Sequence, residues 1–409
     1  MHIVIINQYC GSLVHGMEYR HFYLAKEMIK MGMEVTIISG SYSHLHKEQP
    51  VTHGKFTFEE IEGINYYWVK IPTYKKSISL HRLINMMAFA WKTRHFHKKN
   101  IKKPDLIIVS SPSLLPVVLG KKWANHCKAK LFFEIRDIWP LTLQELGGLS
   151  KWNPLVKIFS CFEKYGYKNA DKVVSLLPNA YSHFKKLGVP ESNFAYIPNG
   201  IAEEDWGSNT PLPESHQLLI NQLKKEGKFI MAYTGTHGVA NSLDTLIKVF
   251  SQLKEENLAL VLVGKGQEKA NLIQLASDLD CTNVHFLDPV DKPCMPTLLA
   301  QFDGLYVGLQ KHSLFRFGIS PNKMFDYMMA EKPIIQAIEA GNNIVKEARC
   351  GFYAEPENIE DIKNAILKLA NFSDNERVEM GLNGKKYVLE NHSYKNLALK
   401  YVQLMNEKM

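Results

Sequence analysis

The sequence has few of the features that mark membrane-spanning, secreted or metal-binding proteins. Among its 409 residues no apolar run reaches the roughly 18 residues that a membrane-spanning helix needs. The six cysteines are scattered and include no CxxC pair, so we expect reduced thiols and neither a disulfide framework nor a zinc site. The N-terminus lacks the basic start of a signal peptide and enters directly as a strand-like run. These absences predict a globular protein of the cytoplasm.

One stretch, residues 75–104, lacks acidic residues altogether. It holds nine Lys or Arg and three His, within a chain of net charge +8. Five of its apolar residues fall on one helical face, which are Leu80, Leu83, Ile84, Met87 and Trp91. Basic residues gather at the end of that helix. This pattern is typical of a helix that lies on an anionic membrane surface. The alternative is a core-facing helix followed by a solvated basic loop.

A second aromatic and basic helix is expected over residues 151–168, where Trp152, Phe159 and Phe162 make it a further candidate membrane contact. No nucleic-acid-binding motif accompanies the positive charge of the chain, so we expect no nucleic acid among its partners.

The order of strand-like and helix-like runs predicts two α/β domains with parallel sheets. A chain of this length is too long for one ordinary core. The first series of runs ends near the polar, proline-bearing linker that follows Ile197, and a second series begins with the strand at Phe229. We expect one domain over residues 1–198, another over 199–385, and a final helix over 386–409.

The first loop, after the strand over residues 2–7, holds Gly11 and Gly16 but not the spacing GxGxxG. A dinucleotide-binding fingerprint is therefore not indicated. Gly11 either lets a ligand approach the backbone or is an ordinary turn glycine. Glu18 and Arg20, at the start of the following helix, are expected to reach into the same cleft.

Charged residues follow the strand that ends at Ile135. In an open parallel sheet ligands bind just beyond the carboxyl ends of the strands. Arg136 and Asp137 are therefore candidate cleft residues, and the alternative is a structural ion pair between the two.

The segment 317–333 has the features of a helix start that holds an anion. Ser320 can cap the helix, Pro321 fits its first position, and Asn322 and Lys323 bring backbone N–H groups that have no acceptor inside the helix. A lysine at the positive end of the helix dipole is unfavourable unless a phosphate meets it. Asp326 lies on the same face and suits a hydroxyl-rich group. Lys323 and Asp326 together therefore indicate a nucleotide diphosphate-sugar as the ligand. The alternative is a plain capped helix whose lysine leans into solvent.

Three further loops follow strands of the second domain. Gly235 and His237 follow one strand, Gly264 follows the next, and Val290 follows the third. Val290 and the residues after it are expected to meet the base through backbone groups.

Together these segments resemble glycosyltransferase family 4, a family of retaining sugar-nucleotide transferases. The motifs that carry the resemblance are IPNG at 197–200, GKGQE at 264–268 and SPNKMFDYMMAEKP at 320–333. Within the family the chain looks most like the bacterial branch that acts on lipid-linked oligosaccharides, including the N-acetyl-L-fucosaminyl transferases of O-antigen and capsule synthesis. NQYCGSLVHGMEYR at 7–20 and FEIRDIWP at 133–140 carry this narrower likeness.

The resemblance implies a GT-B fold of two facing Rossmann-like domains, with the C-terminal helix packing back onto the first. It implies that the first domain binds the acceptor and the second the nucleotide-sugar. The implied donor is a UDP-sugar, with UDP-N-acetyl-L-fucosamine as a candidate, and the implied acceptor is a lipid-diphosphate-linked saccharide. It further implies a peripheral protein on the inner face of the cell membrane, without a metal or a resident cofactor. The alternatives are a nucleotide-sugar epimerase of the same fold and an inactive binding protein.

The chain departs from the family at several positions. The second of two family glutamates, which binds ribose, is here Asp326, and Gly318 stands at the position of the first. The usual basic pair after the opening strand of the second domain is replaced by His237 and Asn241, which leaves Lys323, with Arg316, as the cation for the diphosphate. A histidine of the first domain is replaced by Arg136 and Asp137, and Asp137 is expected to orient the sugar or the acceptor.

The expected catalytic residues are Arg136, Asp137 and Lys323. The expected binding residues are Gly11, Gly16, Glu18, Gly235, His237, Gly264, Val290, Arg316, Ser320, Asn322, Lys323 and Asp326.

Overall fold

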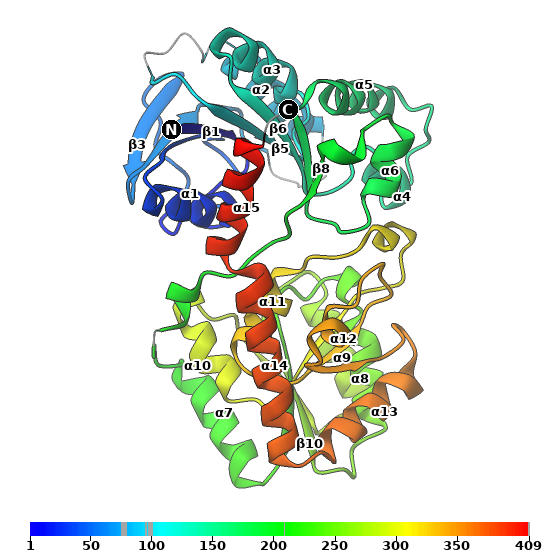
Figure 1. Cartoon of the computed structure of the whole chain (residues 1–409). Coiled ribbons are helices and arrows are strands. Elements are labelled where there is room, and N and C mark those ends of the chain that lie inside the picture. The colour runs from blue at the N-terminus through cyan, green and yellow to red at the C-terminus, as the bar shows by residue number, and fades with distance from the viewer. Residues whose placement is uncertain (75–79, 95, 97–100, 208, 408–409) are drawn as a thin grey trace. The chain divides into compact units, whose positions relative to one another are not determined.

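The computed structural model describes residues 1–74, 80–94, 96, 101–207 and 209–407. The chain divides into two compact units, which are Met1–Asn199 together with Tyr394–Met409, and Gly200–Ser393 (Figure 1). Each unit is built on its own sheet with helices packed against it. The predicted architecture of two parallel-sheet α/β domains is confirmed, and the change of unit falls between Asn199 and Gly200.

The first unit has an eight-stranded sheet in the order β3-β4-β2-β1-β5-β6-β7-β8, parallel except where β3 pairs antiparallel with β4. Its strands are β1 (His2–Ile6), β2 (Glu34–Gly40), β3 (Phe56–Ile61), β4 (Ile64–Val69), β5 (Leu106–Ser110), β6 (Lys130–Ile135), β7 (Lys172–Ser175) and β8 (Phe194–Tyr196). Its helices are α1 (Arg20–Lys30), α2 (Leu80–Thr93), α3 (Pro116–Cys127), α4 (Leu141–Glu145), α5 (Pro154–Asn169), α6 (Tyr181–Lys186) and α15 (Tyr394–Asn406). The central strands β1 and β5 are buried along their whole length, which explains their continuous apolar runs.

The second unit has a six-stranded parallel sheet in the order β11-β10-β9-β12-β13-β14. Its strands are β9 (Phe229–Thr234), β10 (Leu258–Val263), β11 (Val284–Leu287), β12 (Gly304–Gly308), β13 (Ile334–Ala337) and β14 (Gly351–Tyr353). Its helices are α7 (Glu214–Lys225), α8 (Leu243–Ser251), α9 (Lys269–Asp278), α10 (Met295–Ala300), α11 (Asn322–Met329), α12 (Ile344–Ala348), α13 (Ile359–Ala370) and α14 (Asp374–His392).

Side chains of β9 alternate between two core clusters, one on each face of this sheet. Ile230 and Ala232 belong to the cluster that includes residues of α11, and Met231 and Tyr233 belong to the cluster that includes residues of α8. The strand order reverses between β9 and β12, because β10 and β11 lie on one side of β9 and β12 to β14 on the other. Such a switch point is where open parallel sheets bind ligands, beyond the carboxyl ends of the strands.

The end of the chain differs from the single final helix predicted over 386–409. Helix α14 ends at His392, and Ser393 is extended with φ −65° and ψ 137°, so a separate helix, α15, begins at Tyr394. Helix α14 belongs to the second unit and α15 to the first, where the ring of Tyr394 stacks on Tyr23 at 5.1 Å. The return of the C-terminal helix to the first unit is as expected, but that helix is shorter than predicted.

Candidate functional site

Two glycines at the carboxyl edge of the second unit let the loops after β9 and β10 touch. Gly235 has φ +135° and Gly264 has φ +155°, a region that favours glycine. A Cβ on Gly264 would lie only 1.9 Å from the carbonyl oxygen of Gly235. The backbone N–H of His237 donates to the carbonyl oxygen of Lys265 at 2.9 Å, which joins the loops further along. The glycines therefore leave bare backbone at the switch point.

The amine of Lys323 lies against this edge. Its Nζ is 2.6 Å from the hydroxyl of Tyr233, 3.5 Å from Oδ1 of Asn241 and 4.0 Å from the centre of the Tyr233 ring. A Cβ on Gly235 would lie 3.0 Å from the same Nζ. No carboxylate in the described ranges pairs with Lys323, and burial lowers its pKa to about 7. The side chain lies against a strand end and does not lean into solvent.

The helix that carries Lys323 begins one residue later than predicted. Pro321, with φ −77° and ψ 126°, is extended and precedes the helix, so Asn322 is its first residue and Lys323 its second. The expectation that Ser320 caps the helix and Pro321 opens it is therefore wrong. The expected inward face is confirmed, because Met324, Tyr327 and Met328 are fully buried. The shift keeps Asn322 and Lys323 in the first turn, where N–H groups lack acceptors inside the helix.

His237 is fully buried beside these groups, and both ring nitrogens lack a hydrogen-bond partner in the structure. Its Nε2 lies 3.1 Å from the position that a Cβ on Gly264 would take. Burial lowers the pKa of His237 to about 4, and the positive charges of Lys269 and Lys323 act in the same direction. A neutral imidazole with unused nitrogens is costly to bury, so this position favours a ligand that accepts or donates a hydrogen bond.

The remaining predicted residues of this unit differ in their burial and in their contacts. Asp326, one helical turn after Lys323, is partly exposed, and burial raises its pKa to about 6. Val290 is partly buried and packs against the core. Arg316 is exposed, and its described contacts are with the Ser313 carbonyl oxygen at 2.6 Å and the ring of Phe317 rather than with Lys323.

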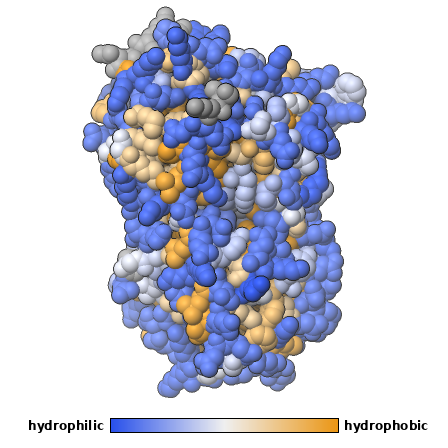
Figure 2. Space-filling view, viewed as in Figure 1, coloured by the Kyte–Doolittle hydropathy of each residue, from blue (hydrophilic) through white to orange (hydrophobic). Residues whose placement is uncertain are grey.

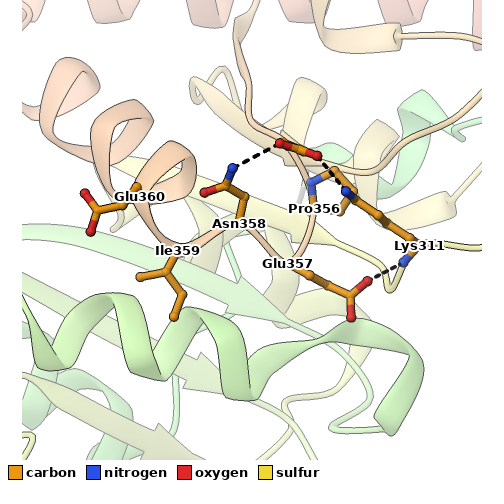
Figure 3. A pocket seen from close by; sticks show the side chains of 7 residues that line it. Lys311, Pro356, Glu357, Asn358, Ile359 and Glu360 are labelled. Carbon is orange, nitrogen blue, oxygen red and sulfur yellow. Dashed lines mark hydrogen bonds and ion pairs between the residues drawn. The ribbon is translucent and has the colours of Figure 1, made fainter.

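A separate hollow of about 450 Å³ lies beyond β14 (Figure 3). Lys311 and residues 355–360 line it, including three glutamates. The amine of Lys311 is 2.6 Å from Oε1 of Glu355, and the backbone N–H of Lys311 donates to Oε2 of Glu357 at 2.8 Å. Because its one cation is already paired among acids, this hollow does not suit an anion. The cluster around Lys323 is the stronger candidate site.

In the first unit the structure joins Glu18 to Arg136. Their side chains form an ion pair and are 10% and 17% exposed, whereas Asp137 is exposed. The alternative of an Arg136–Asp137 structural pair is therefore wrong. The backbone N–H of Arg136 donates to Oγ of Ser111 at 2.9 Å, and its Nε is buried without a partner. Glu18, from the loop before α1, thus meets Arg136, which follows β6, a pairing that the sequence did not predict.

Gly11 and Gly16 are explained by the fold of their own loop. A Cβ on Gly11 would lie 1.8 Å from the carbonyl oxygen of Gly16, and the Gly11 N–H donates to the Glu18 carbonyl oxygen at 3.0 Å. Gly16 has φ +95° and exchanges hydrogen bonds with Ser12. This geometry supports the turn-glycine alternative, and a role of either glycine in ligand binding stays a prediction.

Two family models match the chain and together cover most of it. The model described as Glycosyltransferase Family 4 matches residues 14–205, and the model described as Glycosyl transferases group 1 matches residues 228–371. The chain is a glycosyltransferase with a family 4 domain followed by a group 1 domain.

Similar proteins agree with this assignment. WcaI of Escherichia coli (strain K12) is named as a glycosyl transferase of colanic acid biosynthesis. It is 25% identical to this chain over 306 residues, which cover 73% of this chain and 71% of WcaI. Sucrose-phosphate synthase from Thermosynechococcus elongatus matches with a TM-score of 0.73 at 16% identity, over 98% of both chains. HepE of Anabaena, solved with UDP and glucose, matches with a TM-score of 0.67 at 15% identity, over 99% of both. These structures share the GT-B fold with this glycosyltransferase.

Sequence reasoning missed a buried charged network in the first unit of this glycosyltransferase. Arg20 is 1% exposed and does not reach a cleft as predicted, since its Nε donates to Glu134 at 3.0 Å and one terminal nitrogen donates to the Ile197 carbonyl oxygen at 3.0 Å. His21 and the hydroxyl of Tyr401, from α15, also meet Glu134. Burial alone would raise the pKa of Glu134, but Arg20 and His21 hold it well below its usual range. The signal in the sequence is the acid within LFFEI, since a buried charge needs a partner.

The predicted membrane helix α2 has two apolar faces. Met86, Phe89 and Ala90 are buried, so the helix does face the core, but with a different face from the one that the sequence pattern indicated. A second face exposes three apolar side chains to solvent, which are Ile84 at 46%, Met87 at 53% and Trp91 at 57%. The guanidinium of Arg94 lies 4.3 Å from the Trp91 ring. Residues 75–79, 95 and 97–100, which hold several of the predicted bases, lie outside the described residues.

The second predicted membrane contact is only partly exposed. Phe159 of α5 is buried against Trp139, with ring centres 5.6 Å apart, so its expected outward position is wrong. Trp152 and Ile158 are 69% and 52% exposed, and the amines of Lys151 and Lys157 lie over the Trp152 ring. In the view of Figure 2 hydrophilic residues cover most of the surface, and hydrophobic residues show in separate patches.

None of the helices in the described part of the chain combines the length and apolar composition that a membrane crossing requires. Within the same ranges, His, Cys, Asp and Glu side chains form no group of three or more that could hold a metal ion.

Proposed function

We propose that this glycosyltransferase moves a sugar from a UDP-sugar to a lipid-diphosphate-linked saccharide, with retention of configuration, in the synthesis of a bacterial O-antigen or capsule polysaccharide. The observation that carries the proposal is the amine of Lys323, which lies at the switch point of the second sheet without a carboxylate partner in the described chain. An unpaired cation at a strand edge with bare backbone suits a diphosphate.

Each part of the lysine cluster has a role in holding the leaving group. As the bond to the sugar breaks, negative charge grows on the diphosphate, and the Lys323 ammonium and the first-turn N–H groups of α11 stabilise it. Gly235 and Gly264 let the loops after β9 and β10 pack against each other beside the Lys323 amine, since neither carries a Cβ. The imidazole of His237 supplies a further hydrogen bond from a nitrogen that is otherwise unused.

The nucleoside is expected to extend from this cluster. Asp326, with a pKa of about 6, is mostly ionised at neutral pH and accepts hydrogen bonds from the ribose hydroxyls. The backbone after Val290 meets the base. The choice of uridine is supported by HepE, a structure of the same fold that was solved with UDP and glucose. The candidate sugar remains N-acetyl-L-fucosamine, from the family resemblance.

The acceptor is assigned to the first unit. In a retaining reaction of this family the leaving phosphate takes the proton of the acceptor hydroxyl, so no carboxylate nucleophile is needed. Asp137, exposed after β6, then orients the sugar or the acceptor, and Arg136, held in place by its ion pair with Glu18, lies beside it in the chain. Arg136 can direct its unpartnered Nε to an acceptor oxygen.

A membrane location follows from the acceptor and from the exposed apolar face of α2. Ile84, Met87 and Trp91 project from one side of the helix, with Arg94 beside Trp91. Such a face inserts into the headgroup region while basic side chains meet anionic lipids. We therefore propose peripheral binding to the cytoplasmic face of the cell membrane. The name of WcaI, given for colanic acid synthesis, supports a polysaccharide pathway, and nothing described favours the epimerase alternative.

A donor screen tests the proposed activity. The purified protein is incubated with UDP-glucose, UDP-N-acetylglucosamine or UDP-N-acetyl-L-fucosamine and a polyprenyl-diphosphate saccharide in detergent, and products are followed by mass spectrometry. We expect one donor to extend the acceptor by one sugar, with UDP released and the anomeric configuration kept. Inversion of that configuration would contradict retention. Conversion of a donor to its epimer without acceptor would overturn the proposal.

A further inference from the structure

Lys323 is held in an unusual way for a cation that has no acidic partner. The Tyr233 hydroxyl lies 2.6 Å from its Nζ, and the Tyr233 ring lies beneath the same atom at 4.0 Å. The hydroxyl also donates to the carbonyl oxygen of Thr236 at 2.9 Å. Because its one proton is used on Thr236, the hydroxyl must present its oxygen to the amine as an acceptor.

The tyrosine itself is rigid. Tyr233 is fully buried near the end of β9, in the core cluster that includes residues of α8, and its ring lies 6.2 Å from that of His237. Burial raises its pKa far above the usual range, so the phenol stays neutral. A neutral acceptor with a π face attracts an ammonium but leaves its net charge uncompensated. A carboxylate at the same place would neutralise the lysine before a phosphate arrived.

We propose that Tyr233 is the positioning residue of the donor site: it holds the amine of Lys323 at the switch point of the sheet without neutralising it, so that its ammonium form is available for a diphosphate. This inference rests on the proposed function, since it assigns how the phosphate-binding cation of that site is placed. Tyr233 acts through Lys323 and is not itself assigned a contact with the substrate.

The surroundings of Lys323 predict how binding depends on pH. The groups around the Lys323 amine are Tyr233 of β9, and Asn241 and His237 of the loop after β9. The charge of Lys269 also acts on His237, and Asp326 lies one turn further along the helix of Lys323. Burial lowers the pKa of Lys323 to about 7 in the empty site, and a bound diphosphate raises it. UDP affinity therefore falls as pH rises above about 7, by up to about tenfold per pH unit. Removing the tyrosine hydroxyl disfavours the ammonium further and moves the onset of this fall to lower pH.

The test compares UDP binding by Tyr233→Phe, Lys323→Met and Tyr306→Phe with the wild type, by calorimetry from pH 6.5 to 9. Tyr306 is the matched control, because it is equally buried in the same core cluster on β12, while the described contacts of the Lys323 amine are with Tyr233 and Asn241. We expect Tyr233→Phe to bind UDP about tenfold more weakly at pH 7, the effect of one hydrogen bond to a charged group. Its pH midpoint should lie about one unit lower, and Tyr306→Phe should match the wild type.

The outcomes separate the two proposals. If Lys323→Met weakens UDP binding but Tyr233→Phe keeps the affinity and the pH midpoint of Tyr306→Phe, the positioning role is overturned and the donor site stands. If Lys323→Met binds UDP as well as the wild type, the donor site itself fails and the positioning role with it. A folding defect in Tyr233→Phe would lower the fraction of protein that binds UDP. It would not move the pH midpoint of UDP binding by the protein that still binds.

Discussion

Moving the cation of the donor site from α11 to the loop after β9 is the sharpest perturbation that the structure offers. The amine of Lys323 lies 3.5 Å from Oδ1 of Asn241, so a lysine at 241 can bring its own amine to the same place. Lys323→Met removes a charge-assisted contact worth about 1.5–3 kcal/mol, which corresponds to roughly 10- to 150-fold weaker UDP binding. Adding Asn241→Lys to that variant should recover at least about tenfold of the loss.

The cost of the second change is small. The other described contact of Asn241 is a hydrogen bond from its amide to the carbonyl oxygen of Thr236 at 3.0 Å, and a hydrogen bond of this kind contributes about 1 kcal/mol to stability. The assay is calorimetric titration with UDP at pH 6.5, where both lysines are protonated when phosphate is bound. Asn241→Gln in the Lys323→Met background controls for side-chain length without charge. A Lys323→Met/Asn241→Lys protein that folds but binds UDP no better than this control would refute the reasoning.

Three further predictions follow from other parts of the molecule. Gly264→Ala should abolish detectable UDP binding, because the new Cβ would lie 1.9 Å from the Gly235 carbonyl oxygen and force the two loops apart. Glu134→Gln should lower the free energy of unfolding by about 3–5 kcal/mol, seen as a lower melting temperature, since it leaves Arg20 buried without its carboxylate. Replacing the exposed apolar face of α2 by serines should release the protein from anionic vesicles in a sedimentation assay. The three replaced residues are Ile84, Met87 and Trp91.

Each of these predictions has a control within the chain. Gly207→Ala places a Cβ in open space and should leave UDP binding intact. Lys102→Met breaks an exposed ion pair with Glu34 and should change the melting temperature little, unlike the buried pair. Serines at Leu218 and Val378, exposed in the second unit, should leave vesicle binding unchanged. Equal effects of variant and control would count against the corresponding account.

The local parts of the fold and site were predictable from sequence. The parallel sheets follow from apolar runs alternating with amphipathic helices, and the separation into two units follows from length and the linker after Ile197. Lys323 could be singled out because the unfavourable position of a lysine in a first helical turn is visible within one segment. Its helix began one residue late because Pro321 took an extended conformation instead of the helical one.

The partners of the site residues were not predictable, because they come from distant segments. Tyr233 lies 90 positions before Lys323, and only the packing of α11 beside β9 brings them together. Arg136 pairs with Glu18 and not with its sequence neighbour, since the loop after β1 and the end of β6, separated by β5 in the sheet, lie at the same carboxyl edge. Arg20, which the sequence placed in a cleft, is instead buried in an ion pair with Glu134, 114 positions away.

The most direct test of the central claim, that a diphosphate meets Lys323, compares the affinity of the protein for UDP and for uridine. The wild type should prefer UDP strongly, and Lys323→Met should reduce that preference by at least about tenfold, the worth of a charge-assisted contact, while uridine binds both proteins equally. A preference for UDP that is the same in both proteins would contradict the claim.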